Sequence, residues 1–402
     1  MKSSDIYDII ATIIVAIIFL EKNMKNKFGI YIHIPFCVRK CLYCDFLSFA
    51  CDKDTQERYM EALYKEIKAS SGRLKGKDIS TVFIGGGTPS VVDTVLLGRI
   101  IEALKENYNI EADAEITMEL NPGTVTAESL KEYKAMGINR LSMGLQAWQD
   151  RLLKTLGRIH TADKFKESFL LAREAGFENI NVDIMLSLPG QTMGDVKETF
   201  DNVIALSPEH ISAYSLIIED GTPFKDMFES GHFKEINEDF DRNVYHFSCD
   251  MLAKNGYDRY EISNFSKKGF ESRHNSLYWR TDEYIGFGLG AHSYFNGERF
   301  HNTEDMERYI ALSEEHDSIK EDVEKLTKED KISEFMFMGL RMDEGVKKSV
   351  FKERFGVDMD DIYGDIIIKY KKLGMIEETD DGIHLTDKGI DVSNVIFSEF
   401  LL

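Results

Sequence analysis

Three cysteines within eight residues give this sequence its strongest chemical signal. The run Cys37-Val-Arg-Lys-Cys41-Leu-Tyr-Cys44 spaces the thiols by four and then three residues, so one loop can turn all three toward a single metal centre. A structural zinc site usually has four protein ligands, and His33 or Cys51 could supply the fourth. A four-iron cluster on three thiolates would instead leave one iron open to a small molecule.

The composition narrows the class of protein that carries this loop. The chain has 402 residues, of which 43% are hydrophobic and 30% charged, as in ordinary globular proteins. With 49 basic and 70 acidic residues the net charge is -21, which argues against a nucleic-acid partner. Five cysteines, three of them clustered, make a poor disulfide framework, so we expect a reducing, cytoplasmic compartment.

The first 27 residues form an extension that allows two interpretations. Residues 9–20 are all apolar except for one threonine, but a helix of that length is about 18 Å long, short of the ~30 Å core of a bilayer. One interpretation is that Met24 is the working start, so that the extension is not part of the native protein. The other is a short, weak peripheral membrane anchor.

The elements that position the cysteines alternate between apolar runs and amphipathic segments. The expected strands are residues 29–34, 81–86, 114–120, 140–145, 179–186 and 210–218. The expected helices are about 55–70, 92–107, 126–136, 161–175, 193–206 and 237–255, several with a threonine at the start and a glycine at the end. Six β–α units in series predict an α/β fold with a parallel sheet, a partial (β/α)6 barrel of the TIM type, although periodicity alone leaves a doubly wound sheet open.

Two further regions follow this core. We expect the barrel to cover residues 28–265, an extension rich in glycine, histidine and aromatic residues to cover 266–327, and a small domain to cover 328–402. Helical runs followed by two short strands around Asp380-Asp381-Gly382 predict a C-terminal winged-helix-like domain, which the mixed charge suggests is structural or protein-binding.

Polar residues gather where the expected strands end, and β/α barrels place their chemistry at that face. The cysteine loop follows the first strand, and the glycines of GGGTP follow the second, where they would offer close backbone approach and free amides. The third, fourth and fifth strands contribute Glu119, Gln146 with Arg158 nearby, and Asp183.

The motifs CxxxCxxC after YIHIPF and IGGGTPS further on resemble those of the radical S-adenosylmethionine superfamily. The resemblance runs from about residue 28 to the C-terminus and implies a [4Fe-4S] cluster on Cys37, Cys41 and Cys44. It implies S-adenosylmethionine as the ligand of the open iron, cleaved on reduction to a 5′-deoxyadenosyl radical. The cofactor contacts that it implies are Tyr31, Tyr43, Gly86, Gly87, Thr88, Glu119, Gln146, Arg158 and Asp183.

Within this superfamily the chain resembles the branch of oxygen-independent coproporphyrinogen III oxidases, with one departure. The motif of those oxidases has the form CxxxCxxCxC, and here Phe46 stands in place of the last cysteine. The form with phenylalanine resembles the HemW heme chaperones, whose HNxxYW motif corresponds to His274, Tyr278 and Trp279. The resemblance implies a heme role for these three, although from the residues alone HNSLYW reads as a packed loop.

The sequence therefore predicts a protein that binds heme and passes it to hemoproteins, with an oxidative decarboxylase of coproporphyrinogen or another radical enzyme as the alternative. His292 is a less favoured heme contact than His274. A homodimer is compatible with the sequence.

Overall fold

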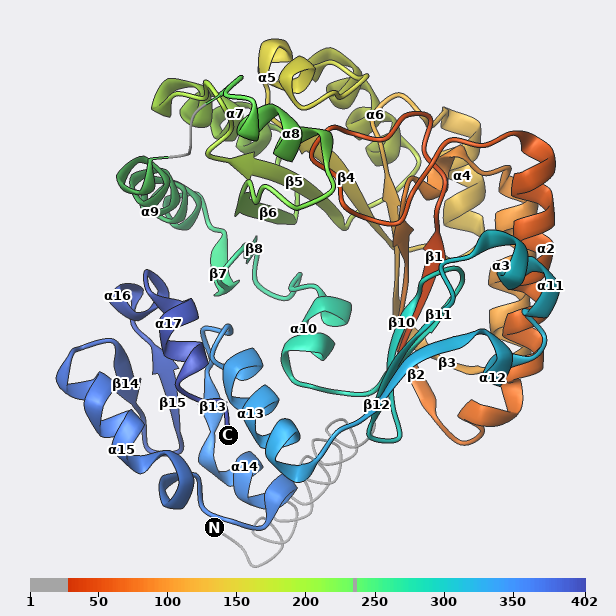
Figure 1. Ribbon diagram of the computed structural model, residues 1–402. Coiled ribbons are helices and arrows are strands. Elements are labelled where there is room, and N and C mark those ends of the chain that lie inside the picture. The colour runs from red at the N-terminus through yellow and green to blue at the C-terminus, as the bar shows by residue number, and fades with distance from the viewer. Residues whose placement is uncertain (1–27, 234–236) are drawn as a thin grey trace, which may run out of the picture.

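The computed structural model describes residues 28–233 and 237–402 (Figure 1). The apolar run at 9–20, with both interpretations of the N-terminal extension, lies outside these residues. Within the described ranges, every helix is too short or too polar to cross a bilayer.

One sheet of twelve strands forms the body of the protein, in the order β12-β11-β10-β9-β1-β2-β3-β4-β5-β6-β8-β7. Strands β9 and β1 to β6 run parallel, and the strands at both ends are antiparallel. The strands are β1 (Phe28–Ile34), β2 (Asp78–Gly86), β3 (Asn109–Leu120), β4 (Arg140–Gln146), β5 (Ile180–Leu186), β6 (His210–Ser215), β7 (Asp258–Glu261), β8 (Asn264–Ser266), β9 (Tyr284–Phe287), β10 (His292–Phe295), β11 (Glu298–Asn302) and β12 (Lys320–Lys325).

Helices cover the outer face of the curved sheet, which stays open on one side as a partial barrel (Figure 1). Strands such as β1 are buried along their whole length because apolar residues point both to these helices and into the barrel. The α-helices of this part are α2 (Lys53–Ala69), α3 (Thr94–Asn107), α4 (Ala127–Ala135), α5 (Asp150–Thr155), α6 (Ala162–Glu174), α7 (Met193–Leu206), α8 (Pro223–Glu229), α9 (Glu238–Lys254), α10 (Arg273–Trp279), α11 (Met306–Leu312) and α12 (His316–Ile319).

The six predicted strands and six predicted helices are confirmed to within a few residues at most ends. Their ends are set by local chemistry. Thr126 caps α4 by accepting from the Ser129 amide, and Gly137, after the same helix, has the positive φ of 96° that favours glycine. The parallel order of β1 to β6 also decides for the barrel over the doubly wound sheet that periodicity left open.

The extension after β8 adds a seventh parallel strand that the periodicity did not predict. Strand β9 pairs with β1, with Ile285 opposite Ile30, and the chain then returns through β10, β11 and β12. Helix α10, which carries HNSLYW, contacts β1 and β2. The extension is thus attached to the first strand of the barrel, beside the cysteine loop.

The C-terminal residues build a second hydrophobic core of their own. The predicted hairpin is confirmed, since β14 and β15 pair antiparallel around Asp381, whose carboxylate accepts from the Ser349 amide (3.1 Å) at the start of α14. The elements are α13 (Lys328–Gly339), β13 (Val346–Lys347), α14 (Lys348–Phe355), α15 (Met359–Lys372), β14 (Ile376–Glu378), β15 (Gly382–Leu385), α16 (Asp387–Ile390) and α17 (Ser393–Ser398).

A buried carboxylate fixes the turn between β9 and β10 to helix α2. Glu66 accepts hydrogen bonds from the Gly288 amide (2.8 Å), the Asn302 side-chain amide (2.7 Å) and the Tyr309 hydroxyl (2.6 Å). The Tyr59 hydroxyl, also on α2, accepts from the Leu289 amide (3.1 Å). Burial raises the pKa of Glu66 from its ordinary 4.5 to about 7, against the three donors that lower it.

This shift predicts how stability changes with pH. Because the folded state holds the Glu66 proton to a higher pH than the unfolded state does, this group makes the free energy of unfolding fall as pH rises from about 4.5 through 7, by at most about 1.4 kcal/mol per pH unit. In Glu66→Gln that part of the slope disappears. Urea denaturation at several pH values in this window measures it, with Glu57→Gln on the exposed face of α2 as the control for a lost charge. Equal slopes for Glu66→Gln and the wild type would contradict the assignment.

Candidate functional site

A cavity of about 340 Å³ at the carboxyl ends of the barrel strands brings most of the predicted site residues together. We call it the inner cavity. Thr88 is at its edge, with its hydroxyl 3.5 Å from Cys37 Sγ, and Tyr31 lines the neighbouring cavity described below. The predicted residues that line the inner cavity are Cys37, Cys41, Cys44, Tyr43, Gly86, Gly87, Glu119, Gln146, Arg158 and Asp183.

The cysteine loop is held by backbone hydrogen bonds at its base and by side chains at its sulfurs. The Cys37 amide donates to the Phe49 carbonyl (3.0 Å), and Arg158 Nη1 donates to Cys41 Sγ (3.6 Å). All three thiols are free, and burial, reinforced by the two neighbouring cysteines, raises the pKa of Cys44. The loop therefore presents three unpaired sulfurs to one cavity.

The zinc interpretation finds no fourth ligand in His33. Its Nδ1 shares a hydrogen bond with the Tyr31 hydroxyl (2.9 Å), and its Nε2 donates to the Leu47 carbonyl (2.9 Å). Among residues 28–233 and 237–402, no three His, Cys, Asp or Glu side chains converge tightly enough to hold a single metal ion.

The glycines after β2 serve the backbone rather than offering free amides, so that part of the prediction was wrong. The Gly86 amide donates to Glu119 Oε2 (3.0 Å), the Gly87 amide to the Ile34 carbonyl (2.8 Å) and the Thr88 amide to the Phe36 carbonyl (2.7 Å). A Cβ on Gly87 would lie 2.6 Å from the Phe36 carbonyl oxygen. Glycine is required here because two strand ends meet backbone to backbone.

Four charged side chains line the inner cavity without pairing with one another, and of these Arg140 is fully buried while the other three are partly buried. Glu119 and Asp183 carry the negative charges and Arg140 and Arg158 the positive ones, yet within the described chain no ion pair joins any two of them. The Nε atoms of both arginines are buried and have no hydrogen-bond partner. Buried charges are normally paired, so the arrangement suits a ligand that carries charges of both signs.

Burial also sets the protonation of the two acids. It raises the pKa of Glu119 from 4.5 to about 7, with the Asp183 charge as the second cause, and it raises the pKa of Asp183, which accepts from Asn181 Nδ2 at 2.7 Å. A cation placed between the two carboxylates would reverse both shifts. The cavity is therefore prepared for a positive group near Glu119 and Asp183.

Sequence reasoning missed a set of polar residues on the inner faces of β4, β5 and β6. They occupy alternate positions of strands that are otherwise apolar, and this period of two was the signal that could have found them. Gln146, which ends β4, has a positive φ of 72°, a strained conformation of the kind found at functional sites. The missed residues are Arg140, Ser142, Asn181, Ser212 and Tyr214.

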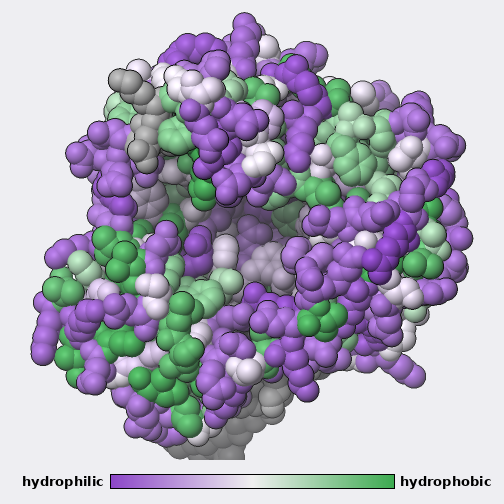
Figure 2. Space-filling model, viewed as in Figure 1, coloured by the Kyte–Doolittle hydropathy of each residue, from purple (hydrophilic) through white to green (hydrophobic). Residues whose placement is uncertain are grey.

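A second cavity of about 600 Å³ adjoins the first and shares Phe46, Gly86 and Glu119 with it. We call it the outer cavity. Tyr278 and Trp279 line its wall, as does His292. The space-filling view shows a hollow on this face of the molecule, between the barrel and the C-terminal elements (Figure 2).

The first member of HNSLYW does not reach the outer cavity. His274 is 1% exposed, its Nδ1 hydrogen-bonds Thr81 Oγ1 (2.8 Å), and its Nε2 hydrogen-bonds the Tyr278 hydroxyl (2.7 Å). The ring also stacks on Phe83, with centroids 5.2 Å apart. The structure thus separates the three predicted heme residues, with two on the cavity wall and His274 in the core behind them.

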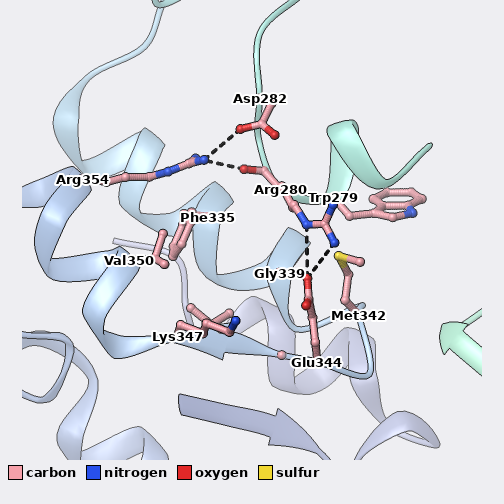
Figure 3. A pocket seen from close by; sticks show the side chains of 12 residues that line it. Trp279, Arg280, Asp282, Phe335, Gly339, Met342, Glu344, Lys347, Val350 and Arg354 are labelled. Atoms are coloured by element: carbon pink, nitrogen blue, oxygen red, sulfur yellow. Dashed lines mark hydrogen bonds and ion pairs between the residues drawn. The ribbon is translucent and has the colours of Figure 1, made fainter. Parts of the chain in front are cut away.

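A third cavity, of about 300 Å³, lies where HNSLYW meets the C-terminal elements (Figure 3). Arg354 on α14 donates to Asp282 (2.8 Å) and to the Arg280 carbonyl (2.9 Å), and Arg280 pairs with Glu344 (2.9 Å). Trp279 and Asp282 line this cavity as well as the outer one. The C-terminal elements therefore support one wall of the outer cavity.

The close approach at Gly87 predicts that even a methyl group there disturbs the cysteine loop. Gly87→Ala places Cβ against Phe36 backbone atoms at 2.6 and 2.8 Å, so we expect a loss of at least about 2 kcal/mol in the free energy of unfolding. Gly72→Ala is the matched control, because no atom lies within 4 Å of its added Cβ. Urea denaturation of both variants makes the comparison, and a Gly87→Ala protein as stable as the control would refute the prediction.

Comparison with known proteins shows which family has this arrangement of residues. Residues 31–203 match the model of the radical SAM superfamily, and residues 326–392 match the HemN C-terminal domain. Coproporphyrinogen III oxidase (HemN) from Escherichia coli, a radical SAM enzyme at 22% identity, has the same fold, with a TM-score of 0.82 over 93% of this chain and 90% of that one.

Curated relatives are closer in sequence. The heme chaperone HemW of Lactococcus lactis is 38% identical over 92% of this chain and 97% of its own length. That of Bacillus subtilis is 36% identical over 92% and 98%. The chain therefore belongs to the HemW family of the radical SAM superfamily.

Proposed function

We propose that this protein is a heme chaperone, which binds heme and passes it to hemoproteins, built on a radical SAM core. The observation that carries the proposal is its similarity, at 35–38% identity over more than nine-tenths of the chain, to several proteins named as heme chaperones. The outer cavity supports it, since its volume lies in the ~300–1,000 Å³ range of cofactor sites and aromatic side chains line it. Transfer of heme to hemoproteins, formation of a homodimer and a cytoplasmic location stay predictions.

The inner cavity fits a [4Fe-4S] cluster and S-adenosylmethionine. Cys37, Cys41 and Cys44 would hold the cluster, which when bound supplies one-electron chemistry and an iron open to a further ligand. Arg158, which donates to Cys41 Sγ, would stabilise the thiolate there.

The unpaired charged side chains of the inner cavity match the charged groups of S-adenosylmethionine. The methionine part of S-adenosylmethionine carries an ammonium, a sulfonium and a carboxylate. Glu119 and Asp183 suit the cations, and Arg140 and Arg158, with their unpartnered Nε atoms, suit the carboxylate. Tyr31, Tyr43, Gly86, Gly87, Thr88 and Gln146 stay proposed contacts from the resemblance.

The second candidate function is oxidative decarboxylation of coproporphyrinogen III. The oxidase shares this fold at 22% identity, which supports the architecture alone. Where the oxidases have a further cysteine this chain has Phe46, whose ring is 63% exposed and lines both cavities. A phenyl ring can contact a macrocycle but can neither transfer a proton nor bind metal. Phe46 therefore favours binding over turnover.

A heme titration paired with a turnover assay separates the two functions. The protein is reconstituted with iron and sulfide without oxygen and titrated with hemin, following the Soret band. We expect a saturable shift near one equivalent, and no protoporphyrinogen when coproporphyrinogen III, S-adenosylmethionine and a reductant are supplied. Turnover at enzyme-like rates, of the order of 1 per second or faster, would refute the chaperone proposal in favour of the oxidase.

The cluster assignment has its own test, with controls inside the chain. Replacing Cys37, Cys41 or Cys44 by serine should abolish the brown colour and the iron content of the reconstituted protein. Cys51→Ser and Cys249→Ser should leave both unchanged, because neither residue lines the inner cavity. Iron and sulfide analysis with absorption spectra makes the comparison. Loss of iron in the Cys51 variant, or its retention without Cys41, would contradict the assignment.

A further inference from the structure

The outer cavity is the place in the molecule where a flat, mostly apolar ligand with polar edges fits. Its wall contains Tyr278, Trp279, Tyr284, Tyr294 and Leu47, and Met338 from α13 adds a thioether. Aromatic rings offer large apolar faces with polar tips, which suits a macrocycle that carries carboxylates at one edge. Heme iron also needs an axial ligand, and histidine is a common one.

Three of the four histidines around this cavity have no ring nitrogen free to coordinate iron. His33 and His274 are buried, and both use their two nitrogens in the hydrogen bonds described above. His301 on β11 uses Nδ1 with the Asn302 carbonyl (2.8 Å) and Nε2 with Asp322 (3.1 Å). Ligation by any of them would first break at least one of these hydrogen bonds, which leaves a buried polar partner unsatisfied at His33 and His274.

His292 differs from the other three in that both of its ring nitrogens are free of described hydrogen-bond partners. It is exposed, it lines the outer cavity, and in the described part of the chain neither of its ring nitrogens has a hydrogen-bond partner. Its ring lies beside that of His301, with centroids 5.1 Å apart. A free imidazole on a cavity wall is what coordination of an iron requires.

The backbone that carries His292 is fixed before any ligand arrives. Glu66 and Tyr59 hold the turn that precedes β10, as described above. The Asn302 amide donates to the Ala291 carbonyl (3.0 Å), and the Gly286 amide donates to Ser293 Oγ (2.9 Å). The residues on both sides of His292 are therefore anchored to the sheet while its side chain is free.

One cation on the same wall suits a propionate. Arg299 lines the cavity with a side chain that is 39% exposed, and its Nη2 donates to Glu334 (2.9 Å). The acids Asp45 and Glu304 also line the cavity and would repel a carboxylate. A heme bound here would thus turn a propionate toward Arg299.

We propose that the outer cavity is the heme site and that His292, not His274, is the protein ligand of the heme iron. Tyr278 and Trp279 then serve as wall, and His274 holds that wall to β2 through Thr81 and the Tyr278 hydroxyl. The inference rests on the proposed heme-binding function and specifies its site.

The test compares hemin binding by the wild type, His292→Ala and the neighbouring control His301→Ala, by Soret titration of the ferric and the reduced protein. We expect His292→Ala to bind at least about tenfold more weakly, with a shifted Soret band that added imidazole moves back, because an iron–nitrogen bond is lost. His301→Ala should keep the wild-type spectrum. Because His292 is exposed, its replacement leaves no cavity in the core, and the thermal unfolding curve checks this.

The outcomes separate this inference from the function on which it rests. If the wild type shows no saturable Soret shift, the proposed function fails. If the wild type binds hemin and His292→Ala keeps both affinity and spectrum, the function stands and the site assignment is overturned. The conservative variant His274→Gln adds a second check, since a shifted Soret band there that added imidazole moves back, with a normal unfolding curve, would mark His274 as the ligand and overturn the proposal.

Discussion

Four charged side chains that line one cavity, with no direct ion pair among them in the described chain, are the constraint on which this barrel depends. Removing a charge from water is costly unless another charge or several hydrogen bonds compensate for it. The fold compensates partially, through the Gly86 amide at Glu119, Asn181 at Asp183 and Asn121 at Arg158. What is left unsatisfied is the two arginine Nε atoms and the two acids with raised pKa values, and all four residues line the inner cavity. The site is thus held in a state that a ligand of mixed charge would complete.

The extension after the barrel matters because it places further residues next to the cysteine loop. Strand β9 attaches to β1, the strand that leads into the cysteine loop, so the turn that carries His292 and the helix that carries HNSLYW both lie next to that loop. Helix α10 is anchored through His274 to Thr81 on β2, and Arg354 joins its end to the C-terminal elements. The outer cavity is therefore assembled from three regions of the chain around one edge of the barrel.

The sequence predicted what local chemistry decides. Alternating apolar runs, a capping threonine such as Thr126 and a terminal glycine such as Gly137 place strands and helices, because these signals act within a few residues. It failed where distant partners decide. Strand β9 has four residues with a glycine among them, and it is a strand because β1 offers an open edge. The amides of Gly86 to Thr88 are occupied by partners more than thirty residues away, so the motif alone suggested free donors.

The site was predicted in the same uneven way. The cysteines and strand-end acids follow from spacing and strand order, since parallel strands bring their carboxyl ends together. The roles of the histidines do not follow, because His274 and His292 differ only in what surrounds them. Thr81, far away in the chain, occupies the ring of His274, whereas no described side chain hydrogen-bonds His292. A histidine in a recognisable motif can be structural, while one in a glycine-rich turn has free ring nitrogens.

Phe46 connects the two cavities in physical terms. An exposed phenyl ring leaves ~1.5–3 kcal/mol of hydrophobic stabilisation unused, so it favours any state in which an apolar surface covers it. Its ring is on the wall shared by the inner and outer cavities, so a macrocycle in the outer cavity would cover it from one side and a nucleoside in the inner cavity from the other. Because both ligands would bury the same ring, binding of one changes the surface offered to the other. A coupling between cofactor and heme would therefore pass through this residue, which lies two positions after Cys44 in the chain.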